Sequence, residues 1–339
     1  LLYKVYSDSN DNVIAIGDIG TIIRSTNGGV NWTNNSIGTD NFLSCIFFID
    51  VLTGWISGEN GMLLKTSNSG ENWQIKNIGY SYPWFHSVFF INNITGWIAG
   101  TDGTILKTTN SGNNWLLCPS GSSDELQDIY FVNENTGIVS GYYDGTVLRS
   151  TNGGINWVNI NNYYGSKLMP IRFINENTGW IGGGNSYGQA VLLKTTNSGI
   201  SWNYSTPTGF TLNSICFVNE SFGWLAGSSS TVLKTSNGGL NWFTQNANAY
   251  HFGVNFSDIF TGWLVGWYGD LLKTTDGGGN WLRQDITVTS TNLNSVYFVD
   301  YNTGWTTGSG GIILKTTTGG NQWTLQNSGT NLQLKRILF

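Results

Sequence analysis

The chain has 339 residues and a net charge of -5, and only 10% of its residues are charged, against about a quarter in typical domains. Eight of the fifteen basic residues occupy one equivalent position of a sequence repeat, so they form no patch for a polyanion, and nucleic acid is excluded as a partner. No apolar run approaches the roughly 20 residues of a membrane-spanning helix. The glycine-rich and tryptophan-rich remainder is typical of turn-rich β structure.

A segment of eight residues, 25–32, organises the sequence because its pattern returns seven more times. Each copy, or box, ends in a tryptophan, and successive boxes lie 41, 42, 42, 45, 40, 39 and 42 residues apart. A fixed period of this length indicates a repeat architecture. The closing tryptophans are predicted to pack each box onto its own sheet; they are Trp32, Trp73, Trp115, Trp157, Trp202, Trp242, Trp281 and Trp323.

Each box predicts a tight turn between two strands. Its asparagine, Asn27 in the first copy, can accept hydrogen bonds from backbone N–H groups just downstream. The glycine two places later, Gly29 in that copy, is present in all eight boxes, as expected where the chain needs a positive φ. We therefore assign the boxes to the fold and not to chemistry.

Taken in chain order, one repeat contains four short β-rich runs, which we name A to D. In one copy they are residues 85–90, 93–100, 104–108 and 115–118, separated by Gly, Asn and Asp. Such runs predict a four-stranded antiparallel meander. Eight meanders predict an all-β, eight-bladed β-propeller, with seven blades as the alternative, in a single domain over residues 1–339.

Large aromatic residues recur in runs A and B. Seven A runs end on a phenylalanine such as Phe90, and six B runs carry a tryptophan such as Trp97. We predict that these residues form the core between blades. Together with the boxes they account for fourteen of the sixteen tryptophans, which leaves Trp84 and Trp267 outside the repeat.

The two ends of the chain compete for one position. Residues 2–7 and 334–339 both match the A pattern, which gives nine A runs for eight blades. We expect the C-terminal run to join the first blade inside the molecule and to leave the N-terminal run as an added or loose strand. The alternative is that a spare strand pairs with the sheet edge of a neighbouring copy, and that head-to-tail pairing builds a filament.

The cysteines and the first residue bear on the location of the protein. Cys45, Cys118 and Cys216 fall in strands of different repeats, so they are predicted to be small buried hydrophobes rather than a disulfide framework. The chain begins with Leu1 rather than Met, from which we expect that a leader was removed. The predicted location is extracellular, at the cell surface or periplasmic.

The run from Thr95 to Gly100, followed by the box that ends at Trp115, resembles the Asp-box or bacterial-neuraminidase repeat. It resembles specifically the propellers similar to the photosystem II stability and assembly factor, and the resemblance covers nearly the whole chain. Asp-box propellers include sialidases, xyloglucan hydrolases, sorting receptors and assembly factors. Here the box aspartate remains only as Asp276, and the assembly factor's arginine-rich patch has no evident counterpart. The resemblance therefore implies an extracytoplasmic propeller.

Residues that break the repeat gather at one end of the meanders. The A–B turns and the boxes lie at one end, whereas the B–C and D–A connections lie at the other and hold nine of the fifteen tyrosines. Binding residues usually collect on such loops, although these aromatic side chains could simply cover the blade ends. The predicted binding set is Tyr80, Tyr82, Trp84, His86, Tyr142, Tyr143, Tyr163, Tyr164, Tyr187, Tyr250, His251, Trp267 and Tyr268.

Catalytic constellations are hard to find in the sequence. A glycosidase needs two carboxylates about 5–10 Å apart, and Asp128 is the first candidate, although a solvated structural role is favoured. Five arginines, two of them in the repeat, do not suit a sialidase triad. His86 and His251 lie in distant repeats, so no metal site is predicted, and no phosphate-binding loop indicates a cofactor.

These sequence features predict two alternative functions. The first is a non-catalytic scaffold that binds a protein partner or copies of itself. The alternative is a glycan-binding or glycoside-hydrolysing propeller that uses Trp84, Trp267 and the tyrosines, with Asp128 as the first acid.

Overall fold

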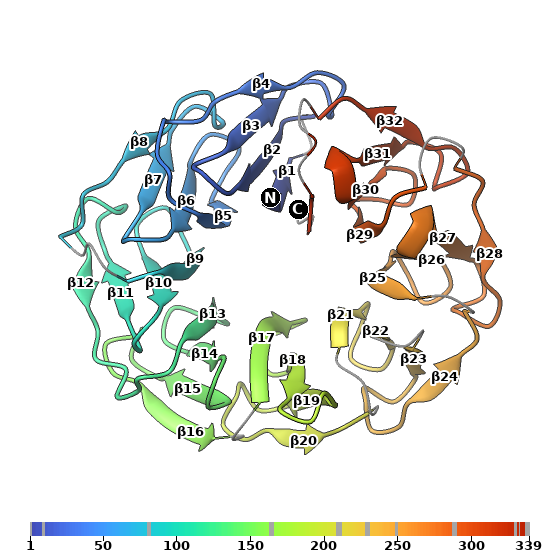
Figure 1. Ribbon diagram of the computed structural model, residues 1–339. Helices are drawn as coiled ribbons and strands as arrows, with labels where there is room; N and C mark the ends of the chain where they lie inside the picture. Colours follow the sequence, from blue (N-terminus) through green and yellow to red (C-terminus); the bar gives the residue numbers. More distant parts are fainter. Residues whose placement is uncertain are drawn as a thin grey trace. The chain divides into compact units, whose positions relative to one another are not determined.

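Eight separate sheets, each of four strands in sequential order, make up the computed structural model (Figure 1). The structure describes residues 2–8, 11–79, 83–162, 166–207, 212–227, 231–247, 250–286, 290–328, 331 and 333–335. All pairings within the sheets are antiparallel, as in β9–β10 and β10–β11. The predicted all-β, eight-bladed propeller with four-stranded antiparallel blades is therefore confirmed. We number the blades 1 to 8 in chain order.

The chain divides into two compact units, Leu1–Ser36 with Phe210–Phe339, and Ile37–Gly209. The first unit holds blades 1, 6, 7 and 8: β1 (Leu2–Ser7), β2 (Val13–Gly17), β3 (Ile22–Ser25), β4 (Thr33–Asn34), β21 (Leu212–Phe217), β22 (Gly223–Gly227), β23 (Thr231–Thr235), β24 (Phe243–Gln245), β25 (His251–Phe256), β26 (Gly262–Gly266), β27 (Leu271–Thr274), β28 (Leu282–Arg283), β29 (Leu293–Phe298), β30 (Gly304–Gly308), β31 (Ile313–Thr316) and β32 (Thr324–Gln326).

The second unit holds blades 2 to 5: β5 (Leu43–Phe48), β6 (Gly54–Gly58), β7 (Leu63–Thr66), β8 (Gln74–Ile75), β9 (Phe85–Phe90), β10 (Gly96–Gly100), β11 (Ile105–Thr108), β12 (Leu116–Leu117), β13 (Leu126–Phe131), β14 (Gly137–Gly141), β15 (Thr146–Ser150), β16 (Val158–Asn162), β17 (Ser166–Phe173), β18 (Gly179–Asn185), β19 (Ala190–Thr195) and β20 (Asn203–Ser205). Two 3-10 turns, η1 (Trp267–Gly269) and η2 (Ser309–Gly311), complete the elements, and nothing helical in the described ranges has the length or apolar character to cross a membrane. That all eight repeats form one domain stays a prediction.

The box turn has the geometry that its sequence predicts. In blade 2 the Asn68 side-chain oxygen accepts the backbone N–H of Asn72 at 3.0 Å, and the Thr66 hydroxyl accepts that of Gly70 at 3.0 Å. Gly70 has a φ of 78°, in the left-handed region that glycine adopts without strain. The box tryptophan can complete the turn: the indole N–H of Trp32 donates to the carbonyl of Gly29 at 2.9 Å.

Aromatic stacking joins neighbouring blades. Trp97 of β10 lies parallel to Phe131 of the next blade, with ring centroids 3.5 Å apart, and Phe131 meets the box residue Trp157 edge-on at 5.8 Å. The Trp97 indole N–H also donates to the carbonyl of Gly153 at 3.1 Å. All six B-strand tryptophans are at most 2% exposed. The predicted core role of these residues is confirmed.

The repeated basic residues also hold blades together. The Lys65 ammonium lies 4.9 Å from the centre of the Trp55 ring and donates to the carbonyl of Ser111 in the next blade at 2.7 Å. The equivalent Arg149 donates to the carbonyl of Ser198 at 2.9 Å. These contacts give the repeated basic side chains a structural role.

The expectation for the chain ends is wrong in one respect. β1 is itself the inner strand of blade 1 and pairs with β2 from Leu2 to Ser7, so the N-terminal run is neither added nor loose. The C-terminal segment lies beside it: Leu334 forms a parallel bridge with Leu2 and donates its N–H to the carbonyl of Gly308 at 2.9 Å. Because β1 pairs with β2 along its length and buries Leu2, it holds the inner position of blade 1.

All three cysteines are free thiols; Cys45 and Cys118 are buried as predicted, whereas Cys216 is only partly buried. Desolvation raises the pKa of the Cys216 thiol to about 11, which keeps it protonated and unreactive near neutral pH.

Candidate functional site

Exposed aromatic side chains are concentrated at the B–C end of the blades. Of the exposed large apolar side chains among the described residues, six lie at this end, and five of those six are aromatic: Ile19, Tyr143, Tyr187, Tyr250, Trp267 and Tyr268. The box end exposes more apolar side chains, but they are mostly aliphatic, such as Leu240 and Ile200. Aromatic side chains give large contact area at low entropy cost. The B–C end is therefore the better candidate for binding.

In the second unit, side chains of four consecutive blades form one continuous line of contacts, which we name the aromatic stripe. Phe42, just before β5, meets Trp84 edge-on at 5.0 Å, and Trp84 lies 5.2 Å from the His86 ring. Farther along, Tyr142 and Tyr143 are perpendicular at 5.1 Å, and the Lys167 ammonium lies 5.0 Å from the centre of the Tyr142 ring.

Glu125 connects the two halves of the aromatic stripe. Its Oε1 lies 3.0 Å from Nε2 of His86 and accepts the Gln127 side-chain amide at 2.6 Å. The same carboxylate raises the pKa of the Tyr143 hydroxyl, which is hydrogen-bonded to it. Tyr143 thus stays neutral at physiological pH, and the residue is 62% exposed.

A buried acid fixes the loop that presents Tyr143. Asp124 is 2% exposed, and its carboxylate accepts the backbone N–H groups of Glu125 at 2.8 Å, Tyr143 at 2.9 Å and Asp144 at 3.2 Å. Preorganised loops lose less entropy on binding. The exposed tyrosine is therefore held on a rigid support.

In the first unit, a second aromatic group lies on blade 7. Tyr250 and Trp267 are stacked with centroids 4.6 Å apart, and Tyr268 stands edge-on to Trp267 at 6.1 Å. Below them, Nε2 of the buried His251 lies 3.2 Å from Oδ2 of Asp270, whose Oδ1 lies 3.5 Å from Nε of Arg283.

The structure thus divides the predicted binding set. Trp84, His86, Tyr142 and Tyr143 belong to the aromatic stripe, and Tyr250, Trp267 and Tyr268 to blade 7. His251 lies at the same place but is only 1% exposed, so it supports a surface rather than forming one. Tyr187 is 86% exposed, at the turn between β18 and β19. Tyr80, Tyr82, Tyr163 and Tyr164 lie outside the described residues.

Sequence reasoning missed several partners of these residues. Phe42, Gln127 and Lys167 complete the aromatic stripe, and Arg283 and Asp270 complete the blade 7 group. Aligning the repeats position by position could have found Arg283 and Asp270, because each replaces residue types that other blades use. Nothing in the sequence signalled Phe42, since its contact with Trp84 depends on the packing of two blades.

Asp128, the first acid considered for a glycosidase, is hydrogen-bonded on both carboxylate oxygens. One oxygen of Asp128 accepts the Ser87 hydroxyl at 2.9 Å, and the other accepts the backbone N–H of Ile171 at 3.0 Å. These bonds connect the inner strands of blades 3, 4 and 5, so the structural role is favoured. Across the described residues, no group of three His, Cys, Asp or Glu side chains could hold a metal ion.

Comparison with known proteins identifies the family. The model of the photosynthesis system II assembly factor YCF48 family matches residues 24–120 and 244–333, together more than half of the chain. The chain belongs to this family. Among solved structures, YCF48 bound to D1 peptide is 22% identical, with a TM-score of 0.60 over 81% of this chain and 93% of that one. YCF48 from Cyanidioschyzon merolae is 20% identical, with a TM-score of 0.60 over 86% and 99%.

The same fold also occurs in enzymes. The GH74 enzyme of Niastella koreensis is 12% identical, with a TM-score of 0.57 over 98% of this chain and 73% of that one. At such identities these likenesses show the fold alone. No curated protein sequence matches the chain. Membership in the YCF48 family thus rests on the family model, and the solved structures show the shared fold alone.

Proposed function

We propose that this YCF48-family propeller is a non-catalytic, extracytoplasmic module that binds a protein partner through the aromatic stripe. The observation that carries the proposal is the continuity of the aromatic stripe, from Phe42 through Glu125 to Lys167, across four blades. A line of this kind suits an extended polypeptide. The structure of YCF48 with a D1 peptide supports peptide binding as a use of this fold.

The residue types of the aromatic stripe fit protein recognition. Tyr and Trp are enriched at binding hot spots, where a few side chains supply most of the affinity. Tyr143 offers an exposed ring, while Trp84 and Tyr142 are half-buried beside it. Glu125 and Lys167 place one negative and one positive group within the line, which can fix the register of a bound chain.

Self-assembly is not part of this proposal. The described C-terminal residues are bound within their own chain, because Leu2 donates its N–H to the carbonyl of Gln333 at 2.8 Å and Lys335 donates to the carbonyl of Leu2 at 3.0 Å. A strand that is already paired is a poor donor for a neighbouring copy.

Photo-crosslinking in the native cells tests the proposal. A benzophenone amino acid is placed at Tyr143, and in a matched control at Tyr204, an exposed tyrosine of an outer strand. We expect one specific protein adduct from position 143 and none of that mass from position 204. The isolated partner should then bind the wild type at least tenfold more tightly than Trp84→Ala or Tyr142→Ala by calorimetry. Identical adducts at both positions, or unchanged affinity of both variants, would refute the proposal.

A further inference from the structure

Blade 7 departs from the other seven blades at the start of its inner strand. His251 pairs with Gly266 of strand B, in the register that Leu2, Leu43, Phe85, Leu126, Leu168, Leu212 and Leu293 adopt in their own blades. Six leucines and one phenylalanine thus define an apolar position, and six of the seven are fully buried. Only blade 7 places a titratable side chain there.

Asp270 provides the polar partner of the buried His251, with Oδ2 3.2 Å from Nε2 of the histidine. Asp270 is 8% exposed, and its backbone carbonyl accepts the N–H of Gly266. In four other blades the residue that accepts the equivalent bond is Thr21, Met62, Thr104 or Ile312. A buried polar pair is commonly no more stable than an apolar pair of similar volume. The pair is therefore not needed for the fold, which seven other blades build without it.

The turn above the pair is also unusual. Tyr268 has a φ of 55° and Gly269 a φ of 73°, and the N–H of Asp270 donates to the carbonyl of Trp267 at 2.9 Å. This is a type I′ turn, which favours Asn, Asp or Gly at its first central position. Three other blades use Asn60, Asp102 and Gly310 there, while Ile19 in blade 1 is a second exception. A bulky residue held at positive φ stores strain, which is often a sign of function.

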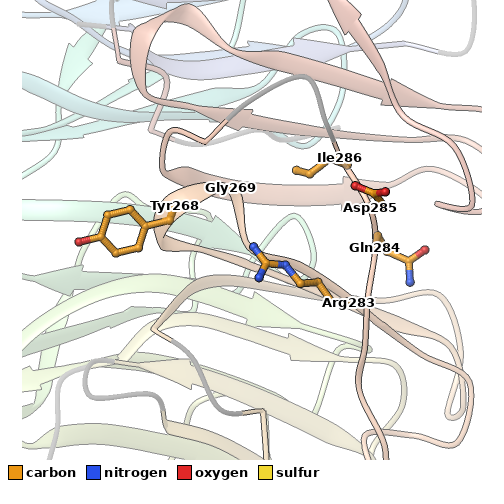
Figure 2. A pocket seen from close by; sticks show the side chains of 6 residues that line it. All are labelled: Tyr268, Gly269, Arg283, Gln284, Asp285 and Ile286. Carbon is orange, nitrogen blue, oxygen red and sulfur yellow. The ribbon is translucent and has the colours of Figure 1, made fainter.

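Tyr268 forms one wall of a pocket of about 260 Å³, lined also by Gly269, Arg283, Gln284, Asp285 and Ile286. Figure 2 shows the Arg283 side chain extending toward Tyr268, with Gln284 and Asp285 on the following chain segment. Arg283 breaks the repeat as well, because the same strand position holds Asn34, Ile75, Leu117, Asn159, Tyr204, Thr244 or Leu325 in the other blades.

The lining specifies the chemistry of a ligand. Arg283, Gln284 and Asp285 carry planar forked groups that offer both donors and acceptors, while Tyr268 and Ile286 offer an apolar surface. The Arg283 guanidinium is paired with Asp270, and Asp285 adds a further carboxylate to the lining, so the pocket does not favour an anion. A neutral polyol with one apolar face matches this combination, and the volume suits a single ring.

We propose that this blade 7 pocket binds one sugar ring of a glycan. One face of the ring lies against the Tyr268–Gly269 turn and Ile286, and adjacent hydroxyl groups bond to Arg283 and Asp285. Asp270 is a positioning residue: it receives His251 on one oxygen and Arg283 on the other, which holds the guanidinium at the pocket. The pocket shares no residue with the aromatic stripe, so the two proposals fail or succeed independently.

Binding of simple sugars to the full chain tests the proposal. The probes are the methyl glycosides of glucose, galactose, mannose, xylose and N-acetylglucosamine, observed by saturation-transfer NMR and titrated for affinity. Tyr268→Asn and Arg283→Leu are the variants, because other blades carry Asn60 and Leu325 at these positions and fold with them. Tyr187→Ala is the control, since Tyr187 is exposed in the other unit.

We expect at least one glycoside to bind in the millimolar range, as a ligand of this size should. Each pocket variant should lower its affinity at least tenfold, and the control should leave it unchanged. The proposal is overturned if none of the five glycosides binds or if binding survives both pocket variants.

Discussion

Blades 7 and 8 are neighbours built on one plan, and they differ where a ligand could be held. Both have four strands of nearly equal length and the same type of B–C turn. Blade 8 has Leu293, Gly310, Ile312 and Leu325 where blade 7 has His251, Tyr268, Asp270 and Arg283. The residues of blade 8 are sufficient for the fold. The different residues of blade 7 are therefore candidates for a function beyond folding. A repeat protein thus contains its own reference for separating structure from function.

The largest expected effect is on stability, and it distinguishes two tryptophans of blade 7: Trp263, which belongs to the repeated core, and Trp267, which lies outside the repeat. Trp263 is fully buried and stacks on Phe298 of blade 8 at 3.4 Å, whereas Trp267 is 38% exposed. Trp263→Ala should lower the free energy of unfolding by about 3–5 kcal/mol. Trp267→Ala should cost less than about 1 kcal/mol. Urea denaturation measures both, and equal losses would contradict the distinction.

The buried polar pair gives the next effect. Asp270→Ile alone leaves a buried His251 without its acid and should destabilise the protein by about 1–3 kcal/mol. Adding His251→Leu restores the arrangement of blade 8 and should recover the wild-type stability or exceed it. The measurement is a double-mutant cycle by urea denaturation. Additive losses in the double variant would mean that the pair does not act as a unit.

The strained turn gives a smaller effect of opposite sign. Tyr268→Asn should raise the free energy of unfolding by about 0.5–1.5 kcal/mol, because Asn tolerates positive φ and Tyr does not. The exchange has a matched reverse: Asn60→Tyr at the same turn of blade 2, where φ is 55°, should be destabilising by a similar amount. Thermal denaturation of both variants measures the two changes in stability. A stabilising effect of Asn60→Tyr would contradict the claim that a tyrosine is strained at this position.

The smallest effect concerns the box of blade 7, which carries Asp276 where most boxes carry Asn. Hydrogen bonds from the backbone and side chain of Asn280 and from Thr274 lower the pKa of Asp276 to about 2 from an ordinary 3.8. Its ionised form therefore stabilises the box above the ordinary pKa, and this contribution disappears as the pH falls through 2. The difference in Tm between wild type and Asp276→Asn should be constant from neutral pH to about pH 5 and should shrink below pH 4. A Tm difference that does not change with pH would contradict the stabilising role of the ionised Asp276.

The sequence predicted the frame because each of its features is local and repeated. Gly70, Asn68 and Thr66 form their turn from contacts within one box, and the Trp97–Phe131 stack needs only that neighbouring copies pack in order. Repetition also separated Trp267 from the structural tryptophans.

The sites were harder to predict because they depend on contacts between different blades. The contact between Glu125 and His86 joins side chains 39 residues apart, and no periodic pattern marks it. The wrong assignment at the chain ends has a related cause: residues 2–7 and 334–339 carry the same pattern, and only the pairing of β1 with β2 shows which one completes blade 1.

One variant tests the central claim that blade 7 departs from the repeat in order to bind a ligand. His251→Leu, Tyr268→Asn, Asp270→Ile and Arg283→Leu together give blade 7 residues that its sister blades use. We predict that this variant unfolds at a higher urea concentration than the wild type and binds the methyl glycosides at least tenfold more weakly. A variant that keeps the wild-type sugar affinity, or that is less stable than the wild type, would contradict the claim.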